Sequence, residues 1–218
     1  MNCLVVAATA AEISPFLSHY RNSEKTAFID FNIDVLMTGV GLTATTYQLS
    51  RYFSLKRPDM VVQAGIAGCF DKKIALATVL AVKKDVIADQ SVIEGKQLKT
   101  IFDMKLASPN QSPYKRGWLE NPAKGVLKRS FLKQVAAISV NHISTNKQMI
   151  EQYKGKFNPA IESMEGAALH YCCLKENITF LQLRSVSNYV GERNKKNWKI
   201  KESITSLNNT LIRLFENL

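Results

Sequence analysis

The sequence lacks the features that mark several large classes of protein. Its 218 residues include only 10 glycines and 6 prolines, too few for a long flexible linker or a collagen-like chain. No apolar run approaches the roughly 20 residues that span a bilayer, and no basic segment precedes the first apolar run, so neither a membrane span nor a signal peptide is predicted. No internal repeat is present. These absences favour a single globular domain over residues 1–218, located in the cytoplasm.

The common nucleotide, metal and nucleophile motifs are also missing. The chain contains neither G-x-x-x-x-G-K-[ST] nor G-x-G-x-x-G, and it has no G-x-S-x-G nucleophile elbow. The three histidines do not share a metal-ligand spacing (His19, His142 and His170). The four cysteines form no C-x-x-C pair, and apolar or helix-like runs predict buried, reduced thiols (Cys3, Cys69, Cys172 and Cys173). We therefore expect no metal ion and no organic cofactor.

Acidic residues are in the minority. The 29 Lys and Arg against 18 Asp and Glu give a formal net charge of +11, which is compatible with a polyanionic partner or with a lysine-rich surface. The basic residues are spread along the chain and are not interleaved with aromatic residues in a stripe. The pattern favours a solvated basic surface, and we expect no nucleic-acid partner and no membrane partner.

Short apolar runs alternate with helical segments. Strands are predicted at 3–8, 60–65, 78–88, 133–140 and 179–184, with a two-stranded meander at 28–33 and 34–37. Helices are predicted at 10–20, 43–54, 145–153, 164–175 and about 200–215, the second and third capped by Thr43 and Thr145. Residues 90–125 are expected to form an irregular insertion. This alternation predicts an α/β fold with three α/β/α layers, in which helices flank a central twisted, mostly parallel mixed sheet.

Four predicted turns follow apolar runs and carry unusual residues, namely 8–12, 64–68, 162–166 and 185–188. Sites collect where the strands of such sheets end, so we expect these turns to meet at one edge. Taken singly, Glu12 and Glu165 are equally explained as first-turn carboxylates that interact with a helix dipole, and Asn188 as a turn asparagine. Their grouping is what indicates a functional site.

The spacing of these turns resembles the nucleoside phosphorylase/nucleosidase superfamily nearly from end to end. The segment M-E-G-A-A at 164–168, followed by R-x-x-S-N at 184–188, carries the likeness. Within the superfamily the chain is most similar to the futalosine hydrolase subfamily, through residues 102–110, 117–122 and 188–193. The resemblance implies the α/β/α fold described above and an enzyme that acts on a small-molecule nucleoside.

The resemblance also implies roles for individual residues. Glu12 would activate water and Asn188 would bind the leaving base, as the two catalytic residues. Glu165 would bind the ribose hydroxyls, where charged hydrogen bonds are about twice as strong as neutral ones. The substrate-binding residues would be Ile66, Ala67, Gly68, Ser163, Met164, Glu165 and Ser187. Because relatives assemble, a homodimer or larger homo-oligomer is implied.

Two positions narrow the implied reaction. Phosphorylases of the superfamily use Gly and Arg in the first strand–helix turn, whereas this turn is Ala-Thr-Ala-Ala-Glu, and Glu12 would repel phosphate. Asn188 stands where adenine-releasing relatives have Asp, and an amide can donate to a 6-oxo group while accepting from a protonated N7. Hydrolysis of futalosine to hypoxanthine and dehypoxanthinyl futalosine, a step of menaquinone biosynthesis, is therefore expected. The alternatives are a methylthioadenosine/S-adenosylhomocysteine-type or other purine nucleosidase, and a nucleic-acid-binding or inactive member of the superfamily.

Overall fold

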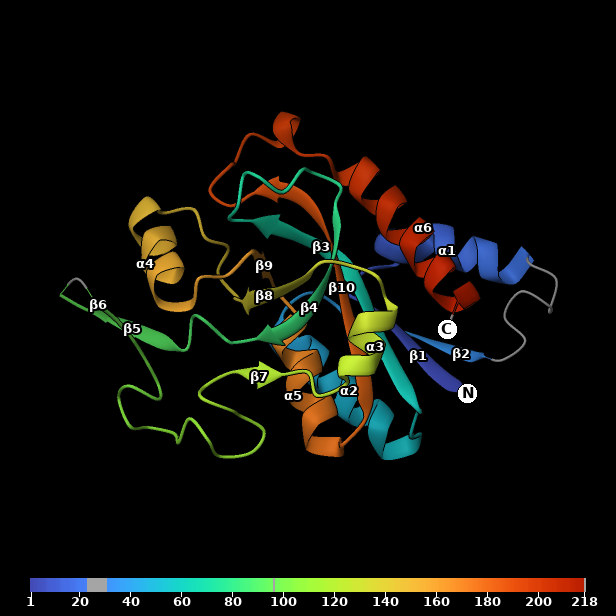
Figure 1. Cartoon of the computed structure of the whole chain (residues 1–218), viewed down its shortest axis with the longest axis horizontal. Coiled ribbons are helices and arrows are strands. Elements are labelled where there is room, and N and C mark those ends of the chain that lie inside the picture. The colour runs from blue at the N-terminus through green and yellow to red at the C-terminus, as the bar shows by residue number, and fades with distance from the viewer. Residues whose placement is uncertain (23–30, 96, 218) are drawn as a thin grey trace.

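The computed structural model describes residues 1–22, 31–95 and 97–217. Helices cover both faces of a twisted mixed sheet, so the predicted α/β/α layering is confirmed (Figure 1). No helix in the described part of the chain is long and apolar enough to cross a bilayer.

Among the described residues, the main sheet contains eight strands and is built around two long ones. Its strands are β1 (Asn2–Ala7), β2 (Asn32–Met37), β3 (Met60–Cys69), β4 (Val79–Asp85), β7 (Leu119–Glu120), β8 (Gln134–Ser139), β9 (Ile161–Ser163) and β10 (Thr179–Tyr189). Strands β2, β1, β3 and β10 run parallel in that order, and β4, β8 and β9 form a second parallel group. The two groups join through antiparallel pairs, β10 with β4 and β3 with β9. The sheet is therefore mixed but mostly parallel, as predicted.

The remaining elements lie around this sheet. The helices are α1 (Ala10–Asn22), α2 (Leu42–Leu55), α3 (Lys124–Arg129), α4 (Lys147–Phe157), α5 (Gly166–Glu176) and α6 (Ile200–Asn217), and one short 3-10 turn, η1 (Lys195–Asn197), precedes α6. A separate hairpin pairs β5 (Ser91–Glu94) with β6 (Gln97–Thr100). In Figure 1, α1 and α6 lie together on one face of the sheet, and α2 and α5 on the other.

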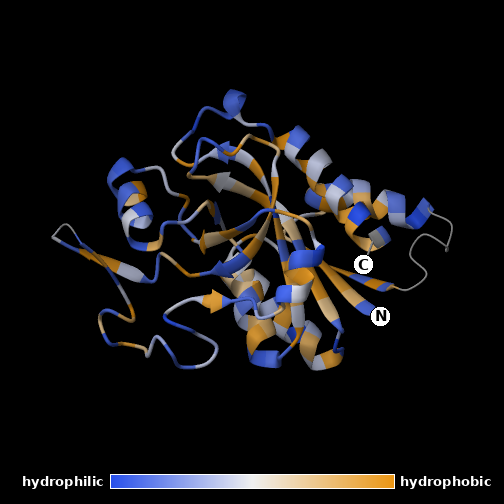
Figure 2. Ribbon diagram, in the orientation of Figure 1, coloured by the Kyte–Doolittle hydropathy of each residue, from blue (hydrophilic) through white to orange (hydrophobic). Residues whose placement is uncertain are grey.

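Alternate residues of β1 face the two helical layers. Cys3, Val5 and Ala7 pack in a cluster with α1 and α6, whereas Leu4 and Val6 pack in a second cluster with α2 and α5. Successive side chains of a strand point to opposite faces, so a strand covered on both sides must be apolar throughout. Figure 2 shows this as largely apolar strands in the sheet, next to helices along which apolar and hydrophilic residues alternate.

Helix α6 also fixes the first turn of α1. The side chain of Asn208 accepts a hydrogen bond from the Phe16 amide at 2.9 Å and donates to the Glu12 carbonyl at 2.8 Å. Because Asn208 is 1% exposed, these bonds form away from competing water. They hold the backbone of Glu12 against the last helix of the chain.

All four cysteines are free and buried, which confirms the prediction made for them. Burial raises the pKa of the Cys3 thiol to about 12, so this sulfur is not a nucleophile at neutral pH.

Several predicted boundaries were wrong. The glycine-rich residues 65–68 and the segment 185–188 are not turns, because they continue β3 and β10 and pair with each other. The helix predicted from 164 begins at Gly166, after an unpredicted strand, β9. In both places, pairing with a distant strand outweighs the local preference of these residues for a turn.

The predicted helix caps and the insertion also differ. Asn146, not Thr145, caps α4 by accepting from the Gln148 and Met149 amides, and α2 begins after Gly41 with no side-chain cap, so Thr43 lies inside the helix. The predicted insertion contains the β5–β6 hairpin and β7. A single strand, β2, covers 32–37 in place of the predicted meander, of which residues 28–30 lie outside the described residues.

We predict that Leu211→Ala destabilises the fold by about 2–5 kcal/mol, because Leu211 is fully buried between α6 and the sheet and truncation leaves a cavity. Urea unfolding measures this change in the free energy of unfolding. The matched control is Leu55→Ala at the end of α2, where the side chain is 77% exposed and we expect a change within about 0.5 kcal/mol. Equal losses in the two variants would contradict the assignment of this core.

Candidate active site

A cavity of about 340 Å³ lies where the carboxyl ends of β1, β3 and β10 meet the starts of α1, α5 and α6. Seven of the nine predicted site residues line it, namely Glu12, Ile66, Ser163, Met164, Glu165, Ser187 and Asn188. Ala67 and Gly68 do not, since Ala67 packs into the core beside β4 and β8, and Gly68 lies next to Asn188 on the paired strand. The structure thus brings together residues that are up to 176 positions apart in the sequence.

Glu12 is held from two sides at the start of α1. Its Oε2 accepts from the Thr9 amide at 3.0 Å and from the Thr9 hydroxyl at 3.3 Å, an arrangement like the second half of a capping box. Its Oε1 accepts from the Ile66 amide on β3 at 3.2 Å. The carboxylate is 8% exposed and faces the cavity with a fixed orientation.

Glu165 stands at the N-cap of α5 and forms a buried ion pair with Arg184. Arg184 Nη1 donates to Glu165 Oε2 at 3.2 Å, and the Gly41 amide donates to Glu165 Oε1 at 3.2 Å. The two side chains are 2% and 7% exposed. Each carboxylate oxygen therefore has one partner from the protein and keeps acceptor capacity for another donor.

Arg184 is the buried partner of Glu165, and the sequence analysis assigned it no role. It lies within β10 and is 1% exposed, and its Nη2 donates to Gln63 Oε1 on β3 at 3.0 Å. A Cβ at Gly65 would overlap Arg184 Nη1 and would lie 3.0 Å from Glu12 Oε1. Gly65 thus provides the space in which the guanidinium and the Glu12 carboxylate approach each other. An arginine inside an apolar strand was the signal in the sequence.

A β-bulge brings Ser187 and Asn188 to the same cavity. Val186 pairs with Ala67 and Asn188 with Gly68, so Ser187 is the extra residue of β10. The Ser187 hydroxyl lies 2.8 Å from Asn188 Oδ1, and Asn188 Nδ2 donates to the Tyr189 carbonyl at 3.1 Å. These contacts fix which end of the amide is the donor and which is the acceptor.

The rest of the cavity wall is largely apolar. Sequence reasoning missed Val40, Trp198, Ile200 and Ile204, which no residue type or motif marked. Ile143 belongs to the loop after β8, and it too faces the cavity. Glu162 on β9 is buried and accepts from both the amide and the hydroxyl of Ser144, and burial raises the pKa of its carboxyl.

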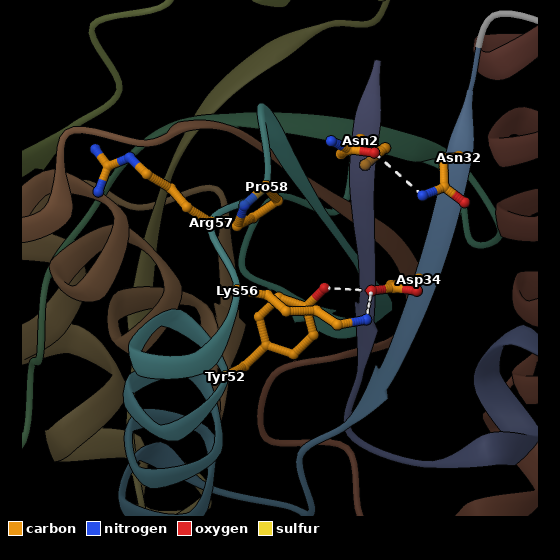
Figure 3. A pocket seen from close by; sticks show the side chains of 8 residues that line it. Asn2, Asn32, Asp34, Tyr52, Lys56, Arg57 and Pro58 are labelled. Atoms are coloured by element: carbon orange, nitrogen blue, oxygen red, sulfur yellow. Dashed lines mark hydrogen bonds and ion pairs between the residues drawn. The ribbon is translucent and has the colours of Figure 1, made fainter.

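A second cavity, of about 300 Å³, lies at the opposite ends of the strands (Figure 3). Its one carboxylate, Asp34, already accepts from the Tyr52 hydroxyl at 2.6 Å and from Lys56 Nζ at 2.8 Å. Asn2 and Asn32 bond to each other at 3.1 Å. Because Asp34 is already paired within the cavity and Arg57 is bonded to Glu176 outside it, this cavity offers no carboxylate prepared for catalysis. No cluster of three or more His, Cys, Asp or Glu within the described ranges could hold a metal ion.

Known proteins resemble this chain in sequence and in fold. No family profile matches the chain. Futalosine hydrolase of Thermus thermophilus is 27% identical over 180 residues, which are 82% of this chain and 79% of that protein. The structure of futalosine hydrolase from Helicobacter pylori has a TM-score of 0.80 at 17% identity, over 100% of this chain and 98% of that one.

A nucleosidase structure is equally similar. The 5′-methylthioadenosine/S-adenosylhomocysteine nucleosidase of Helicobacter pylori, solved with butyl-thio-DADMe-Immucillin-A, has a TM-score of 0.80 at 17% identity, over 100% of this chain and 99% of that one. The predicted resemblance to futalosine hydrolase is thus confirmed in sequence, and the predicted fold is confirmed by the likeness to these two structures. The fold alone does not separate the two activities.

We predict that Gly65→Ala lowers the free energy of unfolding by about 1–3 kcal/mol, because the new methyl group must displace the buried Arg184 guanidinium. The control is Gly155→Ala in α4, where a Cβ meets nothing within 4 Å. That variant should instead become more stable by about 0.5–1 kcal/mol, since alanine favours a helix interior. Denaturant unfolding compares the two, and a stabilised Gly65→Ala protein would contradict the close approach at this site.

Proposed function

We propose that this chain is a futalosine hydrolase, which cleaves the N-glycosidic bond of futalosine with water to give hypoxanthine and dehypoxanthinyl futalosine. The observation that carries the proposal is the convergence of Glu12, Glu165 and Asn188 on one cavity. The relation to the Thermus thermophilus enzyme supports this substrate over others.

The cavity can supply what bond cleavage needs. As the bond from C1′ to the base breaks, its electron pair leaves with the base and the sugar becomes cationic. Glu12 takes a proton from water while the hydroxyl oxygen bonds to C1′, and the same carboxylate stabilises the positive sugar. The leaving base gains a proton at N7 from solvent, because the Asn188 amide is a poor acid.

Glu165 is suited to bind the ribose. Its two oxygens keep one acceptor position each beside Gly41 and Arg184, and a vicinal diol offers two hydroxyl donors. Hydrogen bonds to a carboxylate are about twice as strong as bonds between neutral groups. Met164 lines the cavity from the preceding position and would pack against the sugar.

Asn188 favours a 6-oxopurine. Its Nδ2 has one hydrogen bonded to the Tyr189 carbonyl and a second for the 6-oxo oxygen, and its Oδ1 can accept from a protonated N7. A 6-amino group in the same place would meet a donor. Buried polar groups left unpaired by the wrong base can discriminate by factors of about 10⁴.

Two further features of the cavity support the proposal. One favours water over phosphate as the nucleophile, and the other fits the aryl group at the 5′ end of futalosine. None of the described residues that line the cavity is Lys or Arg, so a phosphate dianion has no counter-ion there. Trp198, Ile200 and Ile204 form an apolar wall suited to an aromatic ring. Arg193 lies 5.7 Å over the Trp198 ring and could approach the carboxylate of futalosine.

An adenine-releasing 5′-methylthioadenosine/S-adenosylhomocysteine nucleosidase is the second candidate, favoured by the equal similarity of such structures. The amide at 188 argues against it. We further propose that the enzyme acts in the cytoplasm, in menaquinone biosynthesis, and as a homodimer or larger homo-oligomer. Val40 and Ile143 are apolar, line the cavity and are exposed, which supports self-association.

We expect the purified protein, in phosphate-free buffer, to release hypoxanthine from futalosine and no adenine from methylthioadenosine. Chromatography of the released base, with inosine as a third substrate, measures this. Glu12→Gln should lower kcat by about 10²–10⁴, because the water then lacks its base. The amide oxygen can still accept the two Thr9 bonds and only the Ile66 amide loses its acceptor, so the variant should fold.

The outcomes discriminate among the candidates. Adenine from methylthioadenosine would favour the second candidate, and no release from any substrate would contradict both. Near-normal turnover by Glu12→Gln would show that another group activates the water.

We predict that Asn188→Asp shifts the preference toward 6-amino purines, because a carboxyl can protonate N7 and accept from an amino group. The ratio of kcat/KM for methylthioadenosine to that for futalosine should rise at least tenfold. Competition assays with both substrates measure the ratio. An unchanged ratio would contradict base recognition by Asn188.

A further inference from the structure

A fully buried polar cluster lies in the protein interior, on the far side of Arg184 from the cavity. Asp85, His170 and Gln182 are each 0% exposed, and none of them lines the cavity. They come from β4, α5 and β10, and Gln182 joins the other two to the Nε side of Arg184. Burying such groups is costly unless each has a partner, so their arrangement needs a reason.

Gln182 connects the members of this cluster. In the orientation that satisfies both ends of the amide, its nitrogen lies 2.9 Å from His170 Nε2 and 3.3 Å from Asp85 Oδ2, and its oxygen lies 3.2 Å from Arg184 Nε. The reverse orientation would place the carbonyl against the carboxylate and the amino group against the Arg184 N–H. The neighbours therefore determine the orientation of this amide.

His170 is a fixed acceptor in this arrangement. Its Nδ1 lies 2.8 Å from the Leu119 carbonyl, so Nδ1 carries the proton and Nε2 accepts from Gln182. Burial lowers the pKa of His170 to about 4, which keeps the ring neutral. Because the ring carries no positive charge, it does not compete with the Arg184 guanidinium for nearby carboxylates.

Asp85 anchors the other end. Its Oδ1 accepts from the Val86 amide at 2.8 Å and from the Ser139 hydroxyl at 3.0 Å. Burial raises the pKa of Asp85 to about 6, opposed by the Ser139 hydrogen bond and by Arg184, so the group is a carboxylate at neutral pH. The glycine at position 166 leaves room for this cluster, because a Cβ there would overlap Asp85 Oδ2 and the Gln182 amide.

We infer that Asp85 and Gln182 are positioning residues, which orient Glu165 through Arg184. Gln182 holds Nε and Gln63 holds Nη2, so Nη1 remains to hold the Glu165 carboxylate. Asp85 determines the orientation of Gln182 and thereby the position of the guanidinium. The inference rests on the proposed role of Glu165 in binding the ribose hydroxyls, and it extends the ribose site to residues that the substrate does not touch.

Asp85→Asn tests the chain of contacts from Asp85 through Gln182 and Arg184 to Glu165, here called the relay. The substitution changes the shape of the side chain very little. The new amide can keep Oδ1 as acceptor for Val86 and Ser139, but its amino group then faces the Gln182 amino group. If Gln182 rotates, its amino group faces Arg184 Nε instead. We expect KM for futalosine to rise about tenfold with a smaller change in kcat, and KM for 2′-deoxyfutalosine to change less than threefold.

A reciprocal exchange supplies the rescue. In the double variant Asp85→Asn/Gln182→Glu, the amide donates to the new carboxylate, which still accepts from Arg184 Nε, and His170 Nε2 takes up a proton and donates to the same carboxylate. The number of buried carboxylates is unchanged. We expect the double variant to recover KM for futalosine to within about threefold of wild type, and Gln182→Glu alone to be impaired because two buried carboxylates then adjoin.

Asn121→Ala is the control for general loss of buried polar contacts. Asn121 is 6% exposed and donates to the Phe180 carbonyl at 2.8 Å, and it contacts neither Arg184 nor Glu165 in any hydrogen bond. This variant should lose stability without changing the ratio of the two KM values. Equal losses on both substrates in Asp85→Asn, without recovery in the double variant, would overturn the inference.

Failure of the relay is distinguishable from failure of the proposed function. The proposed function fails if the wild-type protein releases no base from futalosine. In that case urea unfolding of the same variants decides the relay: a double variant more stable than either single variant supports it, and additive losses overturn it.

Discussion

The candidate site depends on a single buried cation. Arg184 lies in the middle of a central strand and is 1% exposed, and a guanidinium withdrawn from water is stable only if every donor is satisfied. Glu165, Gln63, Gln182 and the Ile66 carbonyl provide acceptors for all three guanidinium nitrogens, and Gly65 leaves the space. Removing one partner of such a pair lowers the free energy of unfolding by roughly 3–5 kcal/mol. The sheet around Arg184 therefore needs the charge of Glu165, and Glu165 is held in place by the packing of that sheet.

The fold holds the second carboxylate by independent means. Glu12 takes its backbone position from Asn208 on α6 and its side-chain orientation from the Thr9 and Ile66 amides. These contacts join the first strand–helix turn to β3 and to the last helix. Glu12 and Glu165 thus approach the same cavity on separate supports, although Arg184 lies between them near Gly65. Two carboxylates with separate supports can carry different roles in one reaction.

The sequence predicted the parts of the site that local chemistry determines. Glu12, Glu165 and Asn188 follow apolar runs, and strand ends of parallel sheets meet at one edge, so these residues could be grouped without coordinates. The extent of β3 and β10 could not be predicted, since pairing between Cys69 and Tyr189 overrides the turn preference of glycine. The wall formed by Trp198, Ile200 and Ile204 was also missed, because a helix start gives no local sign of facing a cavity. Roles for Glu12, Glu165 and Asn188 remain predictions, whereas their convergence is a property of the structure.

Specificity in this fold must arise from a few atoms. A futalosine hydrolase and a 5′-methylthioadenosine/S-adenosylhomocysteine nucleosidase superpose on the chain with the same TM-score of 0.80, so layers, topology and cavity position do not distinguish them. What can distinguish them is the direction of one amide, which the Ser187 hydroxyl and the Tyr189 carbonyl determine at 2.8 and 3.1 Å. Ser187 can do this because the bulge turns it and Asn188 toward the same cavity. A one-residue irregularity in β10 therefore supplies the geometry on which the proposed base recognition rests, while the regular pairing on either side keeps Arg184 in place.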